Sequence, residues 1–98
     1  MGAEVFTTRA KGKTAQEAFR AAKSQALYEY GHRGYTGTIA EKDEFVVITP
    51  PKEWELLPAK YARELLDNDD PRVCDKWGPA GAVKTGEDEW LFFGWASS

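Results

Sequence analysis

The chain has 98 residues, 13 basic and 16 acidic side chains, a net charge of −3 at pH 7 and a hydrophobic fraction of 42%. This length fits one domain, predicted to span residues 1–98, and the composition excludes a disordered, collagen-like or low-complexity chain. The single cysteine excludes an intrachain disulfide, and one cysteine with one histidine excludes a zinc site of four Cys and His ligands within one chain.

The first third of the chain has the pattern of a strand followed by a helix. Residues 4–10 alternate between two faces and are rich in β-branched side chains, which predicts a half-buried strand. Thr14 and Glu17 have the spacing of a capping box, so a helix is expected to begin there. Small apolar residues then recur every three or four positions as far as Tyr30, and Gly31 provides the C-terminal stop.

The middle of the chain predicts a hairpin and a second helix. Residues 38–40 and 45–48 read as strands around a charged turn, and the apolar second run is typical of a central strand. Two prolines end that strand. The second helix follows Pro58 and ends in the acidic, proline-terminated stretch 67–71. Its apolar stripe consists of Tyr61, Ala62, Leu65 and Leu66.

Three further extended pieces, residues 72–77, 82–84 and 89–95, complete the predicted elements. The last is apolar on both faces, so it must be central or covered on both sides. The element order predicts an α+β, ferredoxin-like two-layer sandwich. This would be a βαββαβ unit plus an extra C-terminal strand, with a mainly antiparallel sheet and two helices on one face.

Charge is distributed unevenly along the sequence. Residues 1–35 sum to +3 and residues 36–98 to −6. The two parts are either solvated surfaces or, in the basic part, a face that binds anions. The overall charge argues against nonspecific binding to duplex nucleic acid. No leader-like N-terminus and no run of about 18 apolar residues is visible, so we predict a cytoplasmic protein without a membrane partner.

A segment with three glycines, residues 31–38, is the strongest candidate for a site. It follows a helix and precedes an extended piece, which is the reverse of the order that a phosphate-binding loop needs. The segment is either a helix C-cap with a tight strand entry or a ligand site, because glycine backbone permits close approach of a ligand. We find no cofactor motif and predict no metal site. The polar candidates for ligand binding are His32, Arg33, Tyr35, Thr36 and Thr38.

The aromatic residues extend this candidate site. Trp90 and Trp95 fall on opposite faces of one predicted strand. In a two-layer sandwich one of these rows would meet a loop, a second chain or a ligand, unless the terminal segments close over it. Trp77, which comes directly before the predicted turn 78–81, and Trp95 are added to the candidate ligand-binding residues. Exposed large rings serve as interface anchors and as stacking surfaces for bases.

Three segments carry a resemblance to known sequences: YGHRGYTGTIAEK at 30–42, DKWGPAG at 75–81 and LFFGWASS at 91–98. They resemble a group of small uncharacterised proteins of actinobacteria and their phages. The resemblance implies a bacterial or viral intracellular setting. It implies no catalytic role, because no activity is established for that group.

Three functions remain open at this point. The favoured one is a noncatalytic binding module for a small anionic, nucleotide-like ligand or a host partner protein, acting through the glycine-rich segment and the adjacent aromatics. The first alternative is a small hydrolase or transferase with His32 as general acid or base, oriented by Glu41. The second is a structural protein that forms oligomers, such as a homodimer, through an aromatic seam.

Overall fold

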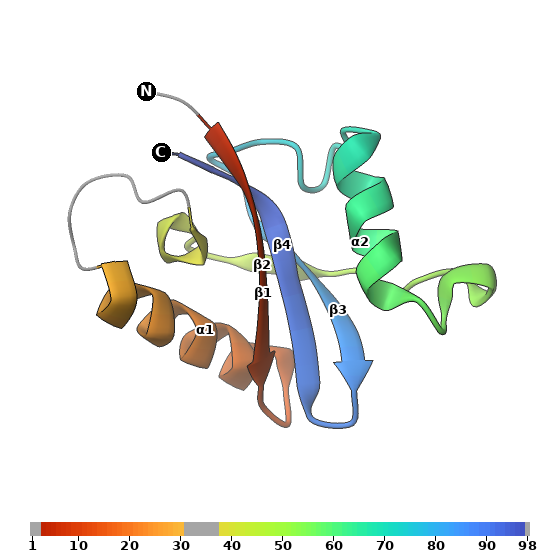
Figure 1. Ribbon diagram of the computed structural model, residues 1–98, viewed down its shortest axis with the longest axis horizontal. Coiled ribbons are helices and arrows are strands. Elements are labelled where there is room, and N and C mark those ends of the chain that lie inside the picture. The colour runs from red at the N-terminus through yellow and green to blue at the C-terminus, as the bar shows by residue number, and fades with distance from the viewer. Residues whose placement is uncertain (1–2, 31–37, 98) are drawn as a thin grey trace.

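The fold is seen in a computed structural model, which describes residues 3–30 and 38–97. Two α-helices, two short 3-10 helices and four strands make up the described chain (Figure 1). In chain order they are β1 (Ala3–Lys11), α1 (Ala15–Tyr30), η1 (Ile39–Glu41), β2 (Phe45–Val47), η2 (Lys52–Trp54), α2 (Pro58–Asp67), β3 (Ala80–Gly86) and β4 (Glu89–Ser97).

The strands form one mixed sheet in the order β1-β4-β3-β2. β4 pairs antiparallel with the whole of β1, from Ala3↔Ser97 to Lys11↔Glu89, and antiparallel with β3 on its other side. β2 pairs with β3 in parallel over three residues. The α+β class and the predominance of antiparallel pairing are thus confirmed, whereas the strand order is not that of a ferredoxin-like sandwich.

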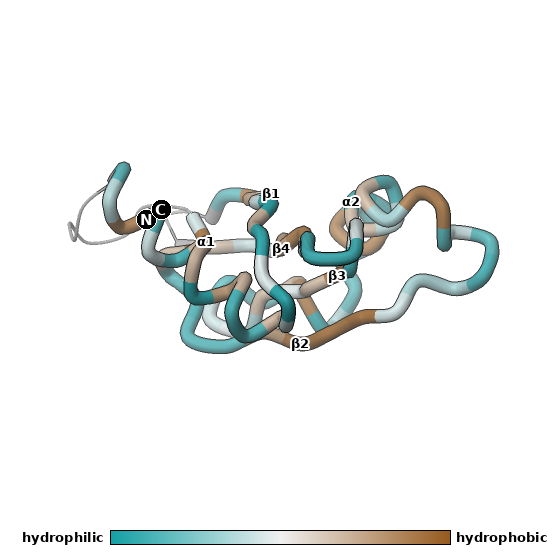
Figure 2. Tube along the Cα trace, turned by 90° about the horizontal axis from the view of Figure 1, so that it is seen from below, coloured by the Kyte–Doolittle hydropathy of each residue, from teal (hydrophilic) through white to brown (hydrophobic). Residues whose placement is uncertain are grey.

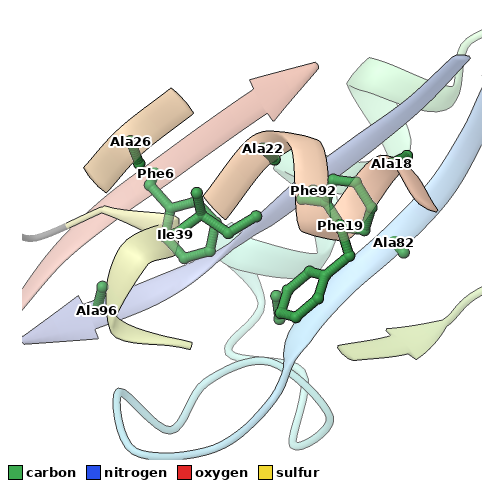
Figure 3. Close-up of a cluster of buried hydrophobic side chains, with 10 residues drawn as sticks. Phe6, Ala18, Phe19, Ala22, Ala26, Ile39, Ala82, Phe92 and Ala96 are labelled. Carbon is green, nitrogen blue, oxygen red and sulfur yellow. The ribbon is translucent and has the colours of Figure 1, made fainter. Parts of the chain in front are cut away.

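The two helices lie on opposite faces of the sheet, so the prediction of two helices on one face is wrong. Figure 2 shows the strands following one another from β1 to β2, with α1 on one side and α2 on the other. Two cores result from this arrangement. In the α1-face core, Phe19 and Ala22 of α1 pack with Phe92 of β4 (Figure 3). In the α2-face core, Leu65 of α2 packs with Phe93 of β4.

Strand β4 confirms the prediction for residues 89–95, because it is central and covered on both faces. Phe92 and Phe93 point to opposite faces, and both are fully buried.

Parallel pairing of β2 with β3 explains where α2 lies. Parallel neighbours need a crossover connection, and α2 lies in that connection.

Two predicted strands are not strands in the structure. Thr38 is the N-cap of the 3-10 helix η1, and residues 39 and 40 lie in that helix. The Thr38 hydroxyl accepts a hydrogen bond from the backbone N–H of Ala40, which bends the chain. Residues 72–77 consist of turns at 72–73 and 76–77 with irregular chain between them. The backbone N–H groups of Val73 and Cys74 both donate to the carbonyl of Asp70, which prevents an extended conformation.

The first helix begins as predicted. The Thr14 hydroxyl accepts from the backbone N–H of Glu17 at 3.2 Å. The Glu17 carboxylate accepts in return from the backbone N–H of Lys13, at 3.1 Å, one residue earlier than a standard capping box requires.

Gly81 of β3 is required by close packing on the α2 face. A Cβ there would lie 2.5 Å from Cζ of Phe93 and 2.8 Å from Cγ1 of Val73. We therefore expect Gly81→Ala to lower the free energy of unfolding by about 1–3 kcal/mol, as overpacking does. Gly86→Ala is the matched control in the same strand, because its Cβ would meet its nearest neighbour at an ordinary 3.5 Å. Urea denaturation of both variants measures the difference, and equal stabilities would contradict the expectation.

Candidate functional site

The structure describes only part of the predicted ligand-binding set. His32, Arg33, Tyr35 and Thr36 lie outside the described residues. Thr38 is the N-cap residue of η1, and its hydroxyl accepts from the backbone N–H of Ala40 at 3.2 Å. One function of the Thr38 side chain is therefore structural, since it fixes the first turn after the glycine-rich segment.

A buried lysine connects η1 to the segment that carries Trp77. Lys42 follows η1 and is only 1% exposed. Its ammonium donates hydrogen bonds to the backbone carbonyls of Asp75, Lys76 and Gly78, at 3.2, 3.1 and 2.9 Å respectively. A charged side chain is rarely this buried unless its donors are paired. Here the three carbonyls provide that pairing.

The environment of Lys42 shifts its protonation. Burial disfavours the ammonium and lowers the pKa of Lys42 from 10.5, while the negative charge of Asp75 raises it in part. Gly94 of β4 lies beside this side chain, and a Cβ there would make only ordinary contacts, 3.8 Å from Cε of Lys42 and 3.4 Å from the ring of Phe6. The φ of Gly94 is +156°, a conformation that other residues rarely adopt.

Hydrogen bonds within the segment 75–78 hold its shape. The Asp75 carboxylate accepts from the backbone N–H of Trp77 at 2.8 Å, and the Asp75 carbonyl accepts from the backbone N–H of Gly78 at 2.9 Å. Upstream, Val73 is 1% exposed and anchors the chain in the α2-face core. The backbone around Trp77 is therefore fixed from both the Lys42 side and the Val73 side.

The preceding turn is held by an ion pair. The guanidinium of Arg72 donates from Nε to Oδ1 of Asp70 at 2.9 Å and from Nη2 to Oδ2 at 3.0 Å. This two-point contact lowers the pKa of Asp70, although burial acts in the opposite direction.

Of the candidate aromatics that the structure describes, Trp77 is the exposed one. The residue is 65% exposed, and Nζ of Lys76 lies over its ring, 5.5 Å from the ring centre. An exposed indole next to an ammonium on a fixed loop can stack on a flat ring while the ammonium neutralises an anion.

Trp95 and Trp90 have a different role from Trp77. Both are half-buried; Trp95 packs against the α2-face core and Trp90 against the α1-face core. With a helix on each face of the sheet, both aromatic rows of β4 have a partner within the chain. The structure thus joins the segment from Thr38 to Lys42 with the Trp77 loop, and it gives Trp95 a packing role.

Sequence reasoning did not find Lys42, the residue that organises this site. Lys42 stands in the charged run 41–44, which is typical of a solvent-exposed turn. The only sequence signal is its position two residues after the apolar pair Ile39-Ala40. Its burial depends on contacts with residues more than thirty positions away.

Among residues 3–30 and 38–97, no group of three or more His, Cys, Asp or Glu side chains is arranged to hold a metal ion. Within the same ranges, no helix is long and apolar enough to span a bilayer.

Comparisons with known proteins found no matching family model, no matching curated protein and no matching solved structure. The resemblance to the actinobacterial and phage group therefore stays a prediction.

Proposed function

We propose that the protein is a noncatalytic binding module for a small anionic, nucleotide-like ligand, with Trp77 as the anchor. One observation carries this proposal. A tryptophan 65% exposed to solvent sits on a loop whose backbone carbonyls are held by a buried ammonium. A rigid loop loses little conformational entropy on binding, so an exposed ring on it can contribute most of its contact energy to affinity.

The chemistry beside the ring favours an anion with a planar group. The ammonium of Lys76 lies over one face of the indole, 5.5 Å from the ring centre. A base would stack on the other face, and this ammonium would neutralise a phosphate. The binding of a partner protein through the same indole is the other outcome that the test distinguishes. The proposed setting is the cytoplasm, which rests on sequence features alone.

The two alternative functions remain predictions with less support. The hydrolase or transferase hypothesis depends on His32, which lies outside the described residues, together with Glu41, half-buried in η1. The oligomer hypothesis depended on an unpartnered aromatic row on residues 89–95. Since Trp90 and Trp95 each pack against a core, that seam lacks its main support among the described residues.

We expect a mononucleotide to raise the Tm of the protein in a thermal-shift panel. Trp77→Ala should weaken the binding of that nucleotide by about 5-fold to 150-fold, because loss of one stacked base costs roughly 1–3 kcal/mol. Isothermal titration gives the affinity. Tyr28→Ala is the matched control, because Tyr28 is an aromatic residue 87% exposed on α1. Circular dichroism of both variants checks the fold.

Three results would contradict this proposal. One is the absence of a Tm shift with every nucleotide in the panel. The second is equal affinity of the Trp77→Ala variant and the unmodified chain. The third is a protein that binds through Trp77 and is not displaced by any nucleotide, which would assign the anchor to a protein partner.

A further inference from the structure

The α2 face of the sheet is only partly covered. Helix α2 packs on β3 and β4. The residues of β1 that point to the same face as Leu91 are Val5, Thr7 and Arg9, and all three are exposed. A strand of the sheet therefore lies open next to a helix.

This opening is a groove between β1 and α2. It consists of two adjoining cavities of about 320 and 430 Å³, both of which are bordered by Arg9 and Ala59. We call it the β1–α2 groove. Its floor is formed by Val5, Thr7 and Leu91, and its opposite wall runs from Leu56, two residues before α2, to Arg63 in α2.

The β1–α2 groove gathers exposed apolar side chains. Leu56 is 91% exposed, Leu57 49% and Val5 37%, and they are three of the six large hydrophobic residues that the described chain leaves exposed. Figure 2 shows the hydrophobic stretch of chain that leads into α2. A cluster of such side chains is the usual mark of a contact surface for another protein.

The groove is also basic in a chain that is acidic overall. Arg9, Lys60 and Arg63 line it, and no Asp or Glu is among its lining residues. At the rim, Oε1 of Glu89 lies 3.3 Å from Nη1 of Arg9 and also accepts from the Thr85 hydroxyl at 2.9 Å. Lys60 and Arg63 have no ion-pair partner among the described residues.

We propose that the β1–α2 groove binds an acidic amphipathic helix of a partner protein. The shape favours a helix, because one lying beside α2 over β1 would complete the layer that α2 begins. The exposed leucines would meet its apolar stripe, and the cationic wall would meet its carboxylates. A second copy of this chain fits less well, since α1 and α2 both bury their apolar faces in its own cores.

The test is a selection from a display library of sixteen-residue helical peptides. In each peptide the positions on one helical face carry Leu or Ala. The positions on either side of that face vary among Glu, Lys and Ser. The full chain is the bait. We expect the enriched peptides to be acidic, with apolar residues at helical spacing. Leu57→Ser and Arg63→Glu should each weaken their binding by about tenfold or more.

Two substitutions on α1 are the matched controls. Tyr28→Ser removes an apolar side chain that is 87% exposed, and Arg20→Glu reverses an exposed charge. Both should leave peptide affinity unchanged. Trp77→Ala should also leave it unchanged, so failure of this inference is distinguishable from failure of the proposed function. Circular dichroism shows that each variant is folded.

The inference is overturned by any of three results. The first is enrichment of basic peptides or of none. The second is full affinity in both Leu57→Ser and Arg63→Glu. The third is a dimer in light scattering that the same two substitutions dissociate, because the groove would then belong to a second copy of the chain.

Discussion

Replacement of Lys42 by methionine is expected to lower the free energy of unfolding by about 2–4 kcal/mol. Methionine keeps most of the apolar length of the side chain but removes the ammonium. The carbonyls of Asp75, Lys76 and Gly78 would then lose a hydrogen-bond donor each. Hydrogen bonds to a charged group contribute roughly 1.5–3 kcal/mol each, and the desolvation cost of the ammonium offsets part of that loss.

The effect of Lys42→Met should depend on pH with a definite sign. Burial lowers the pKa of Lys42 below 10.5 in the folded chain. Between the folded pKa and 10.5, the unfolded chain binds more protons than the folded chain, so the free energy of unfolding rises with pH across that window. Methionine does not titrate. The difference in stability between the unmodified chain and the variant should therefore grow as pH increases through the window.

Urea denaturation from neutral pH to about pH 10.5 measures this difference directly. Lys52→Met is the control, because Lys52 is an exposed lysine in η2. Hydrogen exchange provides a local readout, since the backbone N–H of Gly78 donates to the Asp75 carbonyl at 2.9 Å and should exchange faster in the variant. Unchanged stability with unchanged exchange at Gly78 would show that Lys42 does not hold the Trp77 loop.

The elements that the sequence predicted well are those with a long, regular pattern. Helix α1 was expected between the Thr14 cap and Gly31 and spans Ala15–Tyr30. Strand β4 was expected to be central or covered on both faces, and it is both. In both elements the pattern repeats over several turns or alternations, so local side-chain polarity was sufficient.

The placement of the helices could not be obtained from the same patterns. Periodicity shows which side of α2 is buried but does not show which face of the sheet covers it. A hairpin over 38–48 required antiparallel neighbours, whereas β2 pairs in parallel with β3 and α2 lies in the crossover. The apolar side chains on both faces of residues 89–95 already indicated two covering layers. A two-layer sandwich covers only one of those faces, whereas the structure has a helix on each.

The candidate site was predictable in part. Trp77 was identified from its residue type and its position before a glycine-proline turn, and it is exposed. Trp95 was selected because Trp90 and Trp95 fall on opposite faces of one predicted strand, but its packing against the α2-face core depends on a helix whose position was not predicted. The burial of Lys42 could not be predicted, because it depends on backbone carbonyls of residues 75, 76 and 78, which are far from Lys42 in the sequence.

Substitution of Phe92 or Phe93 by alanine is expected to lower the free energy of unfolding by about 3–5 kcal/mol in each case. The two residues are neighbours in β4, and both are 0% exposed. Phe92 contacts the α1-face core, where its ring centroid lies 5.5 Å from that of Phe19. Phe93 lies in the α2-face core and covers Gly81. A sheet with both helices on one face would leave one of the two rings exposed.

Double-mutant cycles with leucine substitutions separate the two cores while keeping the chain folded. Phe19 and Phe92 are in ring contact, so their substitutions should be coupled by about 0.5–1.5 kcal/mol. Phe19 and Phe93 face opposite sides of the sheet, so their effects should add within about 0.5 kcal/mol. The arrangement of the sheet between α1 and α2 would be wrong if Phe93→Ala hardly changed the free energy of unfolding. It would also be wrong if Phe19 and Phe93 were coupled as strongly as Phe19 and Phe92. The β1–α2 groove would then lose the covered face on which it depends.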